Sequence, residues 1–258
     1  MNKINYFFGK VYSFFMTAVW VLLFAIGTLI AFLFYAVLRI FQLKKFADDV
    51  MWGAGRFWCK AITYMLGAKV TVIGKENIPE AGIGKHCIVA NHESYLDITN
   101  ILGFCKIRTG FVAKSSLRFV PFLNLWMVAF DCTYLKRGNP KSSVEVMRKS
   151  VENVKNGTTM VIFPEGHRSR SGHIEAFKHG SLKLAIRSKA DIVPIAMVGS
   201  RSTFESRNGL FPRPHIVISV LTHISGDNLD KDQKEALALD VENIIRKEAE
   251  RIKKEVLK

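Results

Sequence analysis

The sequence predicts an α/β fold, with a largely parallel or mixed sheet flanked by helices and an apolar helical membrane anchor at the N-terminus. Short β-rich runs alternate with helical stretches from residue 68 onward, a pattern typical of a parallel sheet. A long uncharged segment precedes them, and no internal repeat divides the remainder of the chain. We therefore expect N-terminal membrane-anchoring helices over 1–67 and one α/β domain over 68–258.

Residues 11–38 contain no charged side chain and are flanked by Lys10 and Arg39. A spanning helix needs about 20 apolar residues, so this run is long enough to cross a bilayer. It is too long for the apolar region of a cleavable signal peptide. Two geometries fit the sequence: one tilted spanning helix, or a helical hairpin bent near Gly27–Thr28 that dips into one leaflet.

The net charge of +15 predicts an anionic partner, either a membrane surface or nucleic acid. We expect no nucleic-acid partner, because zinc-finger spacing, RNP-like strings and basic helix-turn-helix patterns are all missing from the sequence. Basic residues are also more numerous after the apolar run than before it, which predicts a membrane-bound protein with its C-terminal domain on the cytoplasmic face. Arg39, Lys44, Lys45, Arg56 and Lys60 follow the run, whereas Lys3 and Lys10 precede it.

Residues 41–67 mix basic and apolar side chains at helical spacing. Two interpretations remain open: an amphipathic helix lying on the membrane, or an ordinary helix packed on the domain core. In the first interpretation, the side buried in the membrane would carry Trp52, Phe57, Trp58 and Tyr64.

The α/β domain is predicted to contain seven strands and several helices. The strand candidates are KVTVIG, HCIVAN, GFVAK, VAFDCTYL, TTMVIF, DIVPIAMVG and HIVISVL. Helical spacing appears over Ser142–Lys155 and Ala176–Ser188, and the stretch from Asp230 to Leu257 is typical of a surface helix.

The four cysteines lie far apart, with no CxxC pair. Cys87 falls within an apolar run and Cys132 borders another. We therefore expect reduced, buried thiols in a cytoplasmic compartment, with no disulfide framework and no metal cluster.

The motif NHESYLD places His92 just after a buried strand, where active-site residues of α/β sheets collect. Asp97 cannot share a helix face with His92, because five residues amount to about 500° of helical rotation. The two can meet only if His92 precedes the helix and Asp97 reaches back from its first turn. An aspartate on one imidazole nitrogen would leave the other nitrogen able to accept a proton. Alternatively, Ser94 and Asp97 form a capping box and Asp97 has no catalytic part.

The motif FPEGHRS also follows a β-rich run and ends in a basic loop. Pro164 ends the strand, and Gly166 allows a tight turn whose backbone N–H groups can meet an anion. Arg168 has a guanidinium group that can bind a phosphate through two parallel hydrogen bonds. Alternatively, this segment is a basic loop that is only solvated. Other chemistries fit poorly: there is no G-x-S-x-G serine, no HExxH zinc pair and no phosphate-binding P-loop.

These motifs resemble those of the glycerolipid acyltransferase family, and most closely its 1-acylglycerol-3-phosphate acyltransferases. NHESYLD resembles the family's NH-x(4)-D block, and FPEGHRS its FPEG-x-RS block. The intervening block and two later ones also look like the family's, in the same order. They comprise Lys114, Leu117, Pro121 and Arg137, then FKHG at 177–180, then VPIA at 193–196.

The resemblance implies transfer of a fatty acyl group from acyl carrier protein or coenzyme A to lysophosphatidic acid, with no metal or other cofactor. His92 would act as the general base and Asp97 would orient it. The phosphate ligands implied are Arg168, Lys114 and Arg137, and Glu165 and Gly166 would shape the acceptor pocket. The alternatives are an acyltransferase for another lysolipid or glycerol 3-phosphate, a thioesterase, and a non-catalytic protein that binds anionic lipid.

Overall fold

The computed structural model describes residues 3–80, 85–136, 138–169, 171–178, 180–204 and 213–256. The expected positions Arg137, His179 and Leu257 lie outside them. The elements are α1 (Lys3–Ile40), α2 (Lys44–Met65), β1 (Lys69–Ile73), η1 (Lys75–Asn77), β2 (His86–Ala90), α3 (Asp97–Phe104), β3 (Thr109–Lys114), η2 (Ser115–Phe119), α4 (Leu123–Ala129), β4 (Thr133–Leu135), α5 (Pro140–Lys155), β5 (Thr159–Ile162), α6 (Lys183–Ser188), β6 (Asp191–Val198), α7 (Arg201–Phe204), β7 (His215–Val220) and α8 (Lys231–Glu255).

The described strands form one seven-stranded sheet in the order β1-β7-β6-β2-β5-β3-β4. Strands β6, β2, β5, β3 and β4 run parallel to one another. Strand β7 pairs antiparallel with β6 and parallel with β1. The sheet is therefore mixed, as the sequence predicts, and the carboxyl ends of its five parallel strands meet at one edge.

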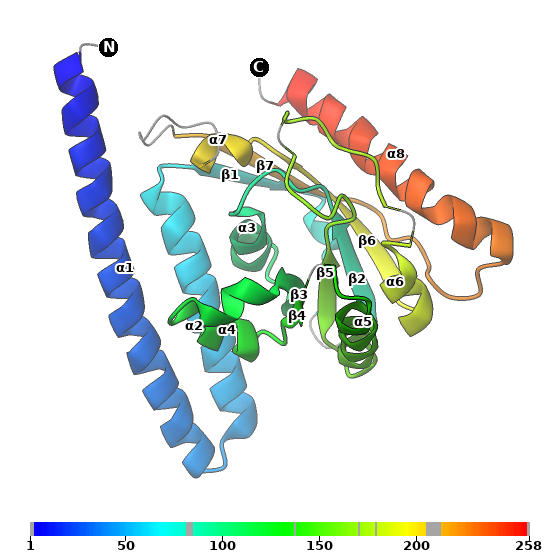
Figure 1. Ribbon diagram of the computed structural model, residues 1–258, viewed down its shortest axis with the longest axis horizontal. Helices are drawn as coiled ribbons and strands as arrows, with labels where there is room; N and C mark the ends of the chain where they lie inside the picture. The colour runs from blue at the N-terminus through cyan, green and yellow to red at the C-terminus, as the bar shows by residue number, and fades with distance from the viewer. Residues whose placement is uncertain are drawn as a thin grey trace.

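Two apolar layers cover the two faces of the sheet, and side-chain alternation divides each strand between them. In β2, Ile88 and Ala90 join the layer that includes residues of α2, α3 and α4, whereas Cys87 and Val89 join the layer of α5, α6 and α8. Figure 1 shows α8 and α6 on the opposite side of the sheet from α1 and α2. Helix α1 lies outermost on its side and packs along α2.

Helix α1 is continuous from Lys3 to Ile40, so the bend near Gly27–Thr28, which the second of the two geometries requires, is not there. The helical hairpin turns instead at residues 41–43, between α1 and α2. Gly27 serves the packing of the two helices, because a Cβ at this position would collide with the ring of Trp58. The neighbouring Thr28 is fully buried and accepts a hydrogen bond of 2.9 Å from Trp126 Nε1 of α4.

Helix α2 packs on the core of the α/β domain, which is the second of the two interpretations of residues 41–67. Its inner face buries Met51 and Cys59, and Trp52 packs partly buried against the same core. Phe57 and Tyr64, expected on the side buried in a membrane, are 62% and 59% exposed.

Two element predictions are wrong in part. The run VAFDCTYL is not one strand, because Val128 and Ala129 end helix α4 and only Thr133–Leu135 pair in the sheet. The chain turns between the two at Asp131, whose φ is 53°. The helix expected over Ala176–Ser188 begins only at Lys183.

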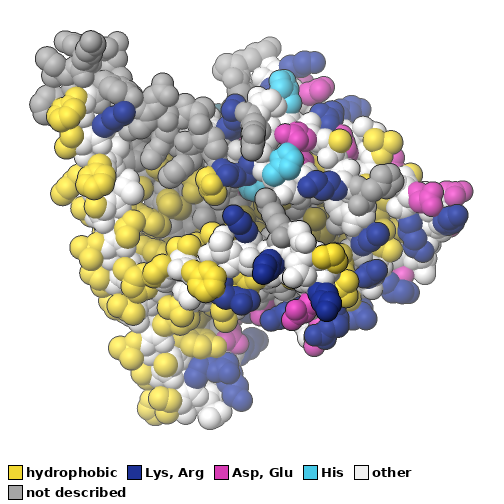
Figure 2. All heavy atoms as spheres, viewed as in Figure 1, with side chains coloured by type: hydrophobic (Ala, Val, Ile, Leu, Met, Phe, Trp, Pro, Cys, Tyr) yellow, Lys and Arg dark blue, Asp and Glu magenta, His cyan; other side chains and the backbone are white. Residues whose placement is uncertain are grey.

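One helix of the described chain, α1, is long and apolar enough to cross a membrane, over the 31 residues Lys10–Ile40. Only 11% of its apolar window is buried in the protein. Figure 2 shows hydrophobic side chains gathered on the α1 side, whereas lysine and arginine spread over the α/β body. Among the most exposed are Phe14, Ile30, Leu33 and Ile40, at 77%, 63%, 69% and 75%. These features support membrane association through α1.

All four cysteines are free and buried. Burial is the main reason that the pKa of each thiol is raised to about 12. Cys87 lies in the layer beneath α8, whereas Cys59, Cys105 and Cys132 lie in the layer beneath α2 and α4.

Candidate active site

The two motifs lie at the same edge of the sheet because they follow two adjacent parallel strands. Strand β2 pairs with β5, with Val89 opposite Ile162. His92 comes two residues after β2 ends, and Phe163 directly follows β5. The two loops are joined where Ser169 N donates to His92 O at 2.7 Å. The aromatic ring of Phe163 also stacks on the His92 imidazole, with centroids 4.1 Å apart and an interplanar angle of 20°.

The structure brings His92 and Asp97 into direct contact, with 2.7 Å between Nδ1 and Oδ2. Asp97 is the first residue of α3 and reaches back to a histidine that precedes the helix. Its side chain is fully buried, whereas that of His92 is 16% exposed. An ionised carboxylate can only accept hydrogen bonds, so Nδ1 carries the proton donated to Asp97. Nε2 of the neutral ring is then an acceptor, suited to take a proton from a substrate.

Asp97 also has part of the capping role considered as an alternative. Its Oδ2 accepts from the backbone N–H groups of Ser94, at 2.9 Å, and Glu93, at 2.7 Å. In a full capping box, Ser94 Oγ would also accept a hydrogen bond from the Asp97 backbone N–H. In the structure, Ser94 Oγ accepts instead from Leu96 N, at 3.2 Å. One carboxylate therefore holds the turn and orients the imidazole at the same time.

Glu165 binds backbone on both sides of its carboxylate. Oε1 accepts from His92 N at 2.7 Å and Oε2 from Glu175 N at 2.9 Å. The residue is 1% exposed, and burial is the main cause of its raised pKa. The structure thus gives Glu165 a fixed position beside the His92 loop, and its place in an acceptor pocket stays a prediction.

Arg168 and Gly166 shape the second loop. The Arg168 guanidinium lies over the Tyr95 ring, with Cζ 3.3 Å from the centroid, so a residue of each motif contributes to this pair. Gly166 occupies the turn with a φ of +73°. A Cβ at Gly166 would lie 2.5 Å from Lys178 Nζ, which places a second cation beside this turn.

Lys114 is the exposed last residue of β3, the strand on the other side of β5. It therefore lies at the same carboxyl edge as the two motifs, one strand away from the loop that carries Arg168. Arg137, the third expected phosphate ligand, lies outside the described residues.

Three further residues at this edge were not singled out from the sequence. The Asn91 amide donates to Met197 O at 2.8 Å and accepts from Met197 N at 2.7 Å, which extends the β2–β6 pairing by one side chain. Ser200 Oγ donates to Asp97 Oδ1 at 2.6 Å. Glu93 is buried, and its pKa is raised to about 7 by burial and then by nearby Asp97. Ser200 follows the strand DIVPIAMVG, so its position after a buried strand was a usable signal.

Comparison with known proteins identifies the class. A family model described as Acyltransferase matches residues 69–198, half of the chain, and this protein belongs to the acyltransferase family. Similar proteins include several named 1-acyl-sn-glycerol-3-phosphate acyltransferase. That of Saccharomyces cerevisiae is 33% identical over 70% of this chain and 60% of its own length. That of Borreliella burgdorferi is 28% identical over 75% of this chain and 77% of its own length.

The crystal structure of the 1-acyl-sn-glycerophosphate acyltransferase from Thermotoga maritima superposes with a TM-score of 0.83 and 25% identity, over 98% of both chains. Curated relatives differ more in length: the chain spans 60% of the yeast protein and 45% of a chloroplast protein from Arabidopsis thaliana. The similarity to the Thermotoga structure extends beyond the matched family region to helices α1 and α2.

Proposed function

We propose that this protein transfers a fatty acyl group from an acyl thioester, carried by acyl carrier protein or coenzyme A, to the free hydroxyl of 1-acyl-glycerol 3-phosphate, giving phosphatidic acid. The observation that carries the proposal is the contact of His92 with the fully buried Asp97 carboxylate, 2.7 Å apart, at the carboxyl edge of the sheet of an acyltransferase-family chain. The names of the relatives support the choice of acceptor.

In the proposed reaction, the acceptor hydroxyl attacks the thioester carbonyl while His92 Nε2 takes its proton. The C–S bond then breaks, and the imidazolium returns the proton to the departing thiolate. Asp97 orients the ring and stabilises its charge. General-base help of this kind contributes about 10²–10⁴-fold. The sequence of steps needs no covalent acyl-enzyme and no metal.

Arg168, Lys114 and Arg137 are proposed to bind the acceptor phosphate. Fixing this group positions the hydroxyl for attack, which lowers the entropic part of the barrier. Support comes from the location of Arg168 in the loop that bonds to His92 through Ser169. Lys114 lies at the same edge of the sheet.

Residues 1–67 are proposed as the membrane anchor and 68–258 as the catalytic domain, on the cytoplasmic face. Both the acceptor and the product are lipids, so an anchored enzyme meets them where they reside. The basic surface would add binding to anionic headgroups, at about 1 kcal/mol per well-placed lysine or arginine.

The test is an acyl-transfer assay on the full chain in detergent, with lysophosphatidic acid and a labelled acyl thioester of each kind. We expect labelled phosphatidic acid from the parent and at least a hundredfold less from His92→Ala. Arg168→Ala should raise the acceptor KM, whereas the matched control Arg148→Ala removes an exposed arginine of α5 and should not.

Each alternative gives a different result in the same assay. Product that is undiminished in His92→Ala would refute the mechanism. Turnover without any lysolipid would indicate a thioesterase. Product only with glycerol 3-phosphate or another lysolipid would change the acceptor, and vesicle binding without any transfer would favour a non-catalytic lipid-binding protein.

A further inference from the structure

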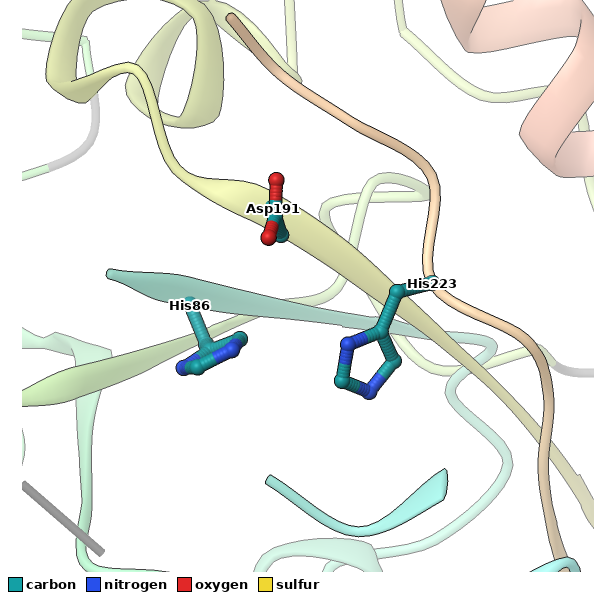
Figure 3. A group of neighbouring side chains, drawn as sticks. All are labelled: His86, Asp191 and His223. Atoms are coloured by element: carbon teal, nitrogen blue, oxygen red, sulfur yellow. The ribbon is translucent and has the colours of Figure 1, made fainter. Parts of the chain in front are cut away.

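A second cluster of polar side chains lies at the opposite edge of the sheet. His86 is the first residue of β2 and Asp191 the first residue of β6, and the two are paired in register. His223 comes three residues after the end of β7. One ligand atom from each of the three lies within 4.8 Å of the others, and Figure 3 shows the two imidazole rings next to each other with Asp191 beside them. No sequence spacing pointed to this group, because its members are more than 100 and 30 residues apart along the chain.

The backbone next to all three side chains is held by hydrogen bonds. Asp191 N donates to Lys85 O at 2.9 Å, which fixes the start of β6 beside the residue before His86. Ile192 and Ile224 form an isolated bridge, with N–H···O distances of 2.8 and 2.9 Å in its two directions. The bridge joins the residue after Asp191 to the residue after His223. The cluster is thus preorganised by its surroundings before any ligand is considered.

The His223 tautomer also suits a metal ligand. Its Nε2 lies 2.7 Å from the backbone carbonyl oxygen of Asn77, so Nε2 carries the proton and Nδ1 the lone pair. In Figure 3, Nδ1 is on the side of the ring that faces the other two residues. A metal-binding histidine typically donates its other ring N–H to a carbonyl or carboxylate in this way.

We propose that His86, Asp191 and His223 bind a Zn²⁺ ion, with water completing a tetrahedral coordination shell. Two imidazoles and one carboxylate are ligands that zinc accepts, at about 2.0–2.2 Å. A tetrahedron with such bonds places its ligand atoms roughly 3.4 Å apart, so the side chains need to close by at most about 1.4 Å. All three are partly exposed, which leaves room for an ion to enter and for a water ligand.

The cluster also has donor atoms available to a metal ion. Within the described residues, the His86 ring and the Asp191 carboxylate make no hydrogen bond with another side chain, so their lone pairs are not used elsewhere.

The ion would be structural and not catalytic. His86 and His92 flank opposite ends of β2, and a five-residue strand is about 16 Å long. A bound ion would join the amino ends of β2 and β6 to the segment after β7, and so crosslink parts that meet only on folding. Metal binding of this kind stabilises the folded state over the unfolded one.

The test is Zn²⁺ binding by the tag-free, metal-stripped full chain, measured by competition with a chromogenic zinc chelator. We expect one Zn²⁺ per chain for the parent and at least a tenfold weaker affinity for Asp191→Asn and His223→Gln. Both substitutions keep side-chain size and can keep a hydrogen-bond donor. His173→Ala is the matched control, because it removes an exposed imidazole outside the cluster and should bind zinc as the parent does.

Thermal unfolding provides the second measurement and shows whether each variant is folded. Zn²⁺ should raise the Tm of the parent and of His173→Ala, and leave the Tm of the two cluster variants unchanged. The proposal is overturned if the parent takes up less than one Zn²⁺ per chain, or if folded Asp191→Asn and His223→Gln bind zinc with the parent's affinity. Neither measurement depends on acyl transfer, so the proposed function stands or fails separately.

Discussion

Asp97 accepts hydrogen bonds from four groups, three in the loop at residues 92–94 and one in the segment after β6. Oδ2 takes the His92 imidazole and the backbone of Glu93 and Ser94, and Oδ1 takes Ser200 Oγ. Such a carboxylate cannot rotate without losing several charge-assisted bonds, each stronger than a neutral one. The imidazole is therefore held in one orientation and one tautomer.

We expect Asp97→Asn to lower the rate of acyl transfer by about 10²–10⁴-fold at saturating substrates. Asparagine keeps the shape but lacks the charge that stabilises the imidazolium, and its NH₂ group cannot accept a bond. The measurement is the turnover of Asp97→Asn compared with that of Asp240→Asn. The control makes the same substitution at an exposed aspartate of α8, so a difference between the two variants is due to the location of Asp97. Equal rates in the two variants would remove Asp97 from the mechanism.

Glu93 should make the stability of the protein depend on pH. Its pKa is raised from 4.5 to about 7, chiefly by burial and next by Asp97. The folded state thus binds this proton more tightly than the unfolded chain. The contribution, of about 3 kcal/mol, is fully present below pH 4.5 and is lost as the pH rises through 7.

Chemical unfolding at several pH values tests this expectation. In Glu93→Gln, the free energy of unfolding should decline less between pH 4.5 and 7 than in the parent. A residual decline is expected, because Glu165 also has a raised pKa and contributes with the same sign. An unchanged pH dependence in the variant would show that Glu93 is ionised in the folded protein.

Among the elements, the strands whose sequences are clearly β-rich and are bounded by polar turns could be predicted from the sequence. β2, β5, β6 and β7 are short β-rich runs bounded by polar turns, and the structure has strands at all four. The prediction for VAFDCTYL was wrong because the first half of this run is equally compatible with a helix. Val128 and Ala129 continue α4, which is anchored by the buried side chains of Trp126 and Met127. Periodicity alone does not separate these outcomes in a short apolar run.

Tertiary contacts decided the rest. The local sequence cannot show whether a glycine bends a helix or leaves space for the side chain of a neighbouring helix. The packing role of Gly27 therefore becomes evident only from the position of the Trp58 ring in the structure. The pairing of His92 with Asp97 was deducible, since both lie in one short motif. The bond from Ser200 was harder to predict, because it depends on β6 lying beside β2.

We expect Gly27→Ala to loosen α1 from α2, because the added methyl group occupies space filled by the Trp58 ring. Gly53→Ala is the matched control: it lies in α2, and a Cβ there meets no atom within 4 Å. Both changes favour helix by about 1 kcal/mol. A lower Tm for Gly27→Ala and an equal or higher Tm for Gly53→Ala would support the close packing, and a higher Tm for both would contradict it.

At the scale of the whole molecule, apolar and basic surfaces are separated. Hydrophobic side chains are concentrated on the α1 side and charged ones over the α/β body (Figure 2). We expect Leu33→Glu to weaken binding to lipid vesicles, since a charge in the apolar part of a bilayer costs about 2.5–3.5 kcal/mol.

Vesicle flotation checks this prediction. Val144→Glu is the control, because Val144 is also 70% exposed but lies on α5 of the α/β body. We expect Val144→Glu to float with the vesicles as the parent does. Equal flotation of Leu33→Glu and the parent would show that this part of α1 stays out of the membrane.

The four buried thiols have a practical consequence. A thiol with a pKa of about 12 and no access to solvent reacts with alkylating reagents only when the surrounding structure opens. Because Cys87 lies on one face of the sheet and the other three on the opposite face, the order of their alkylation separates the opening of the two layers. The alkylation rates of the native cysteines would therefore show whether α8 or the α1–α2 hairpin is the first to detach.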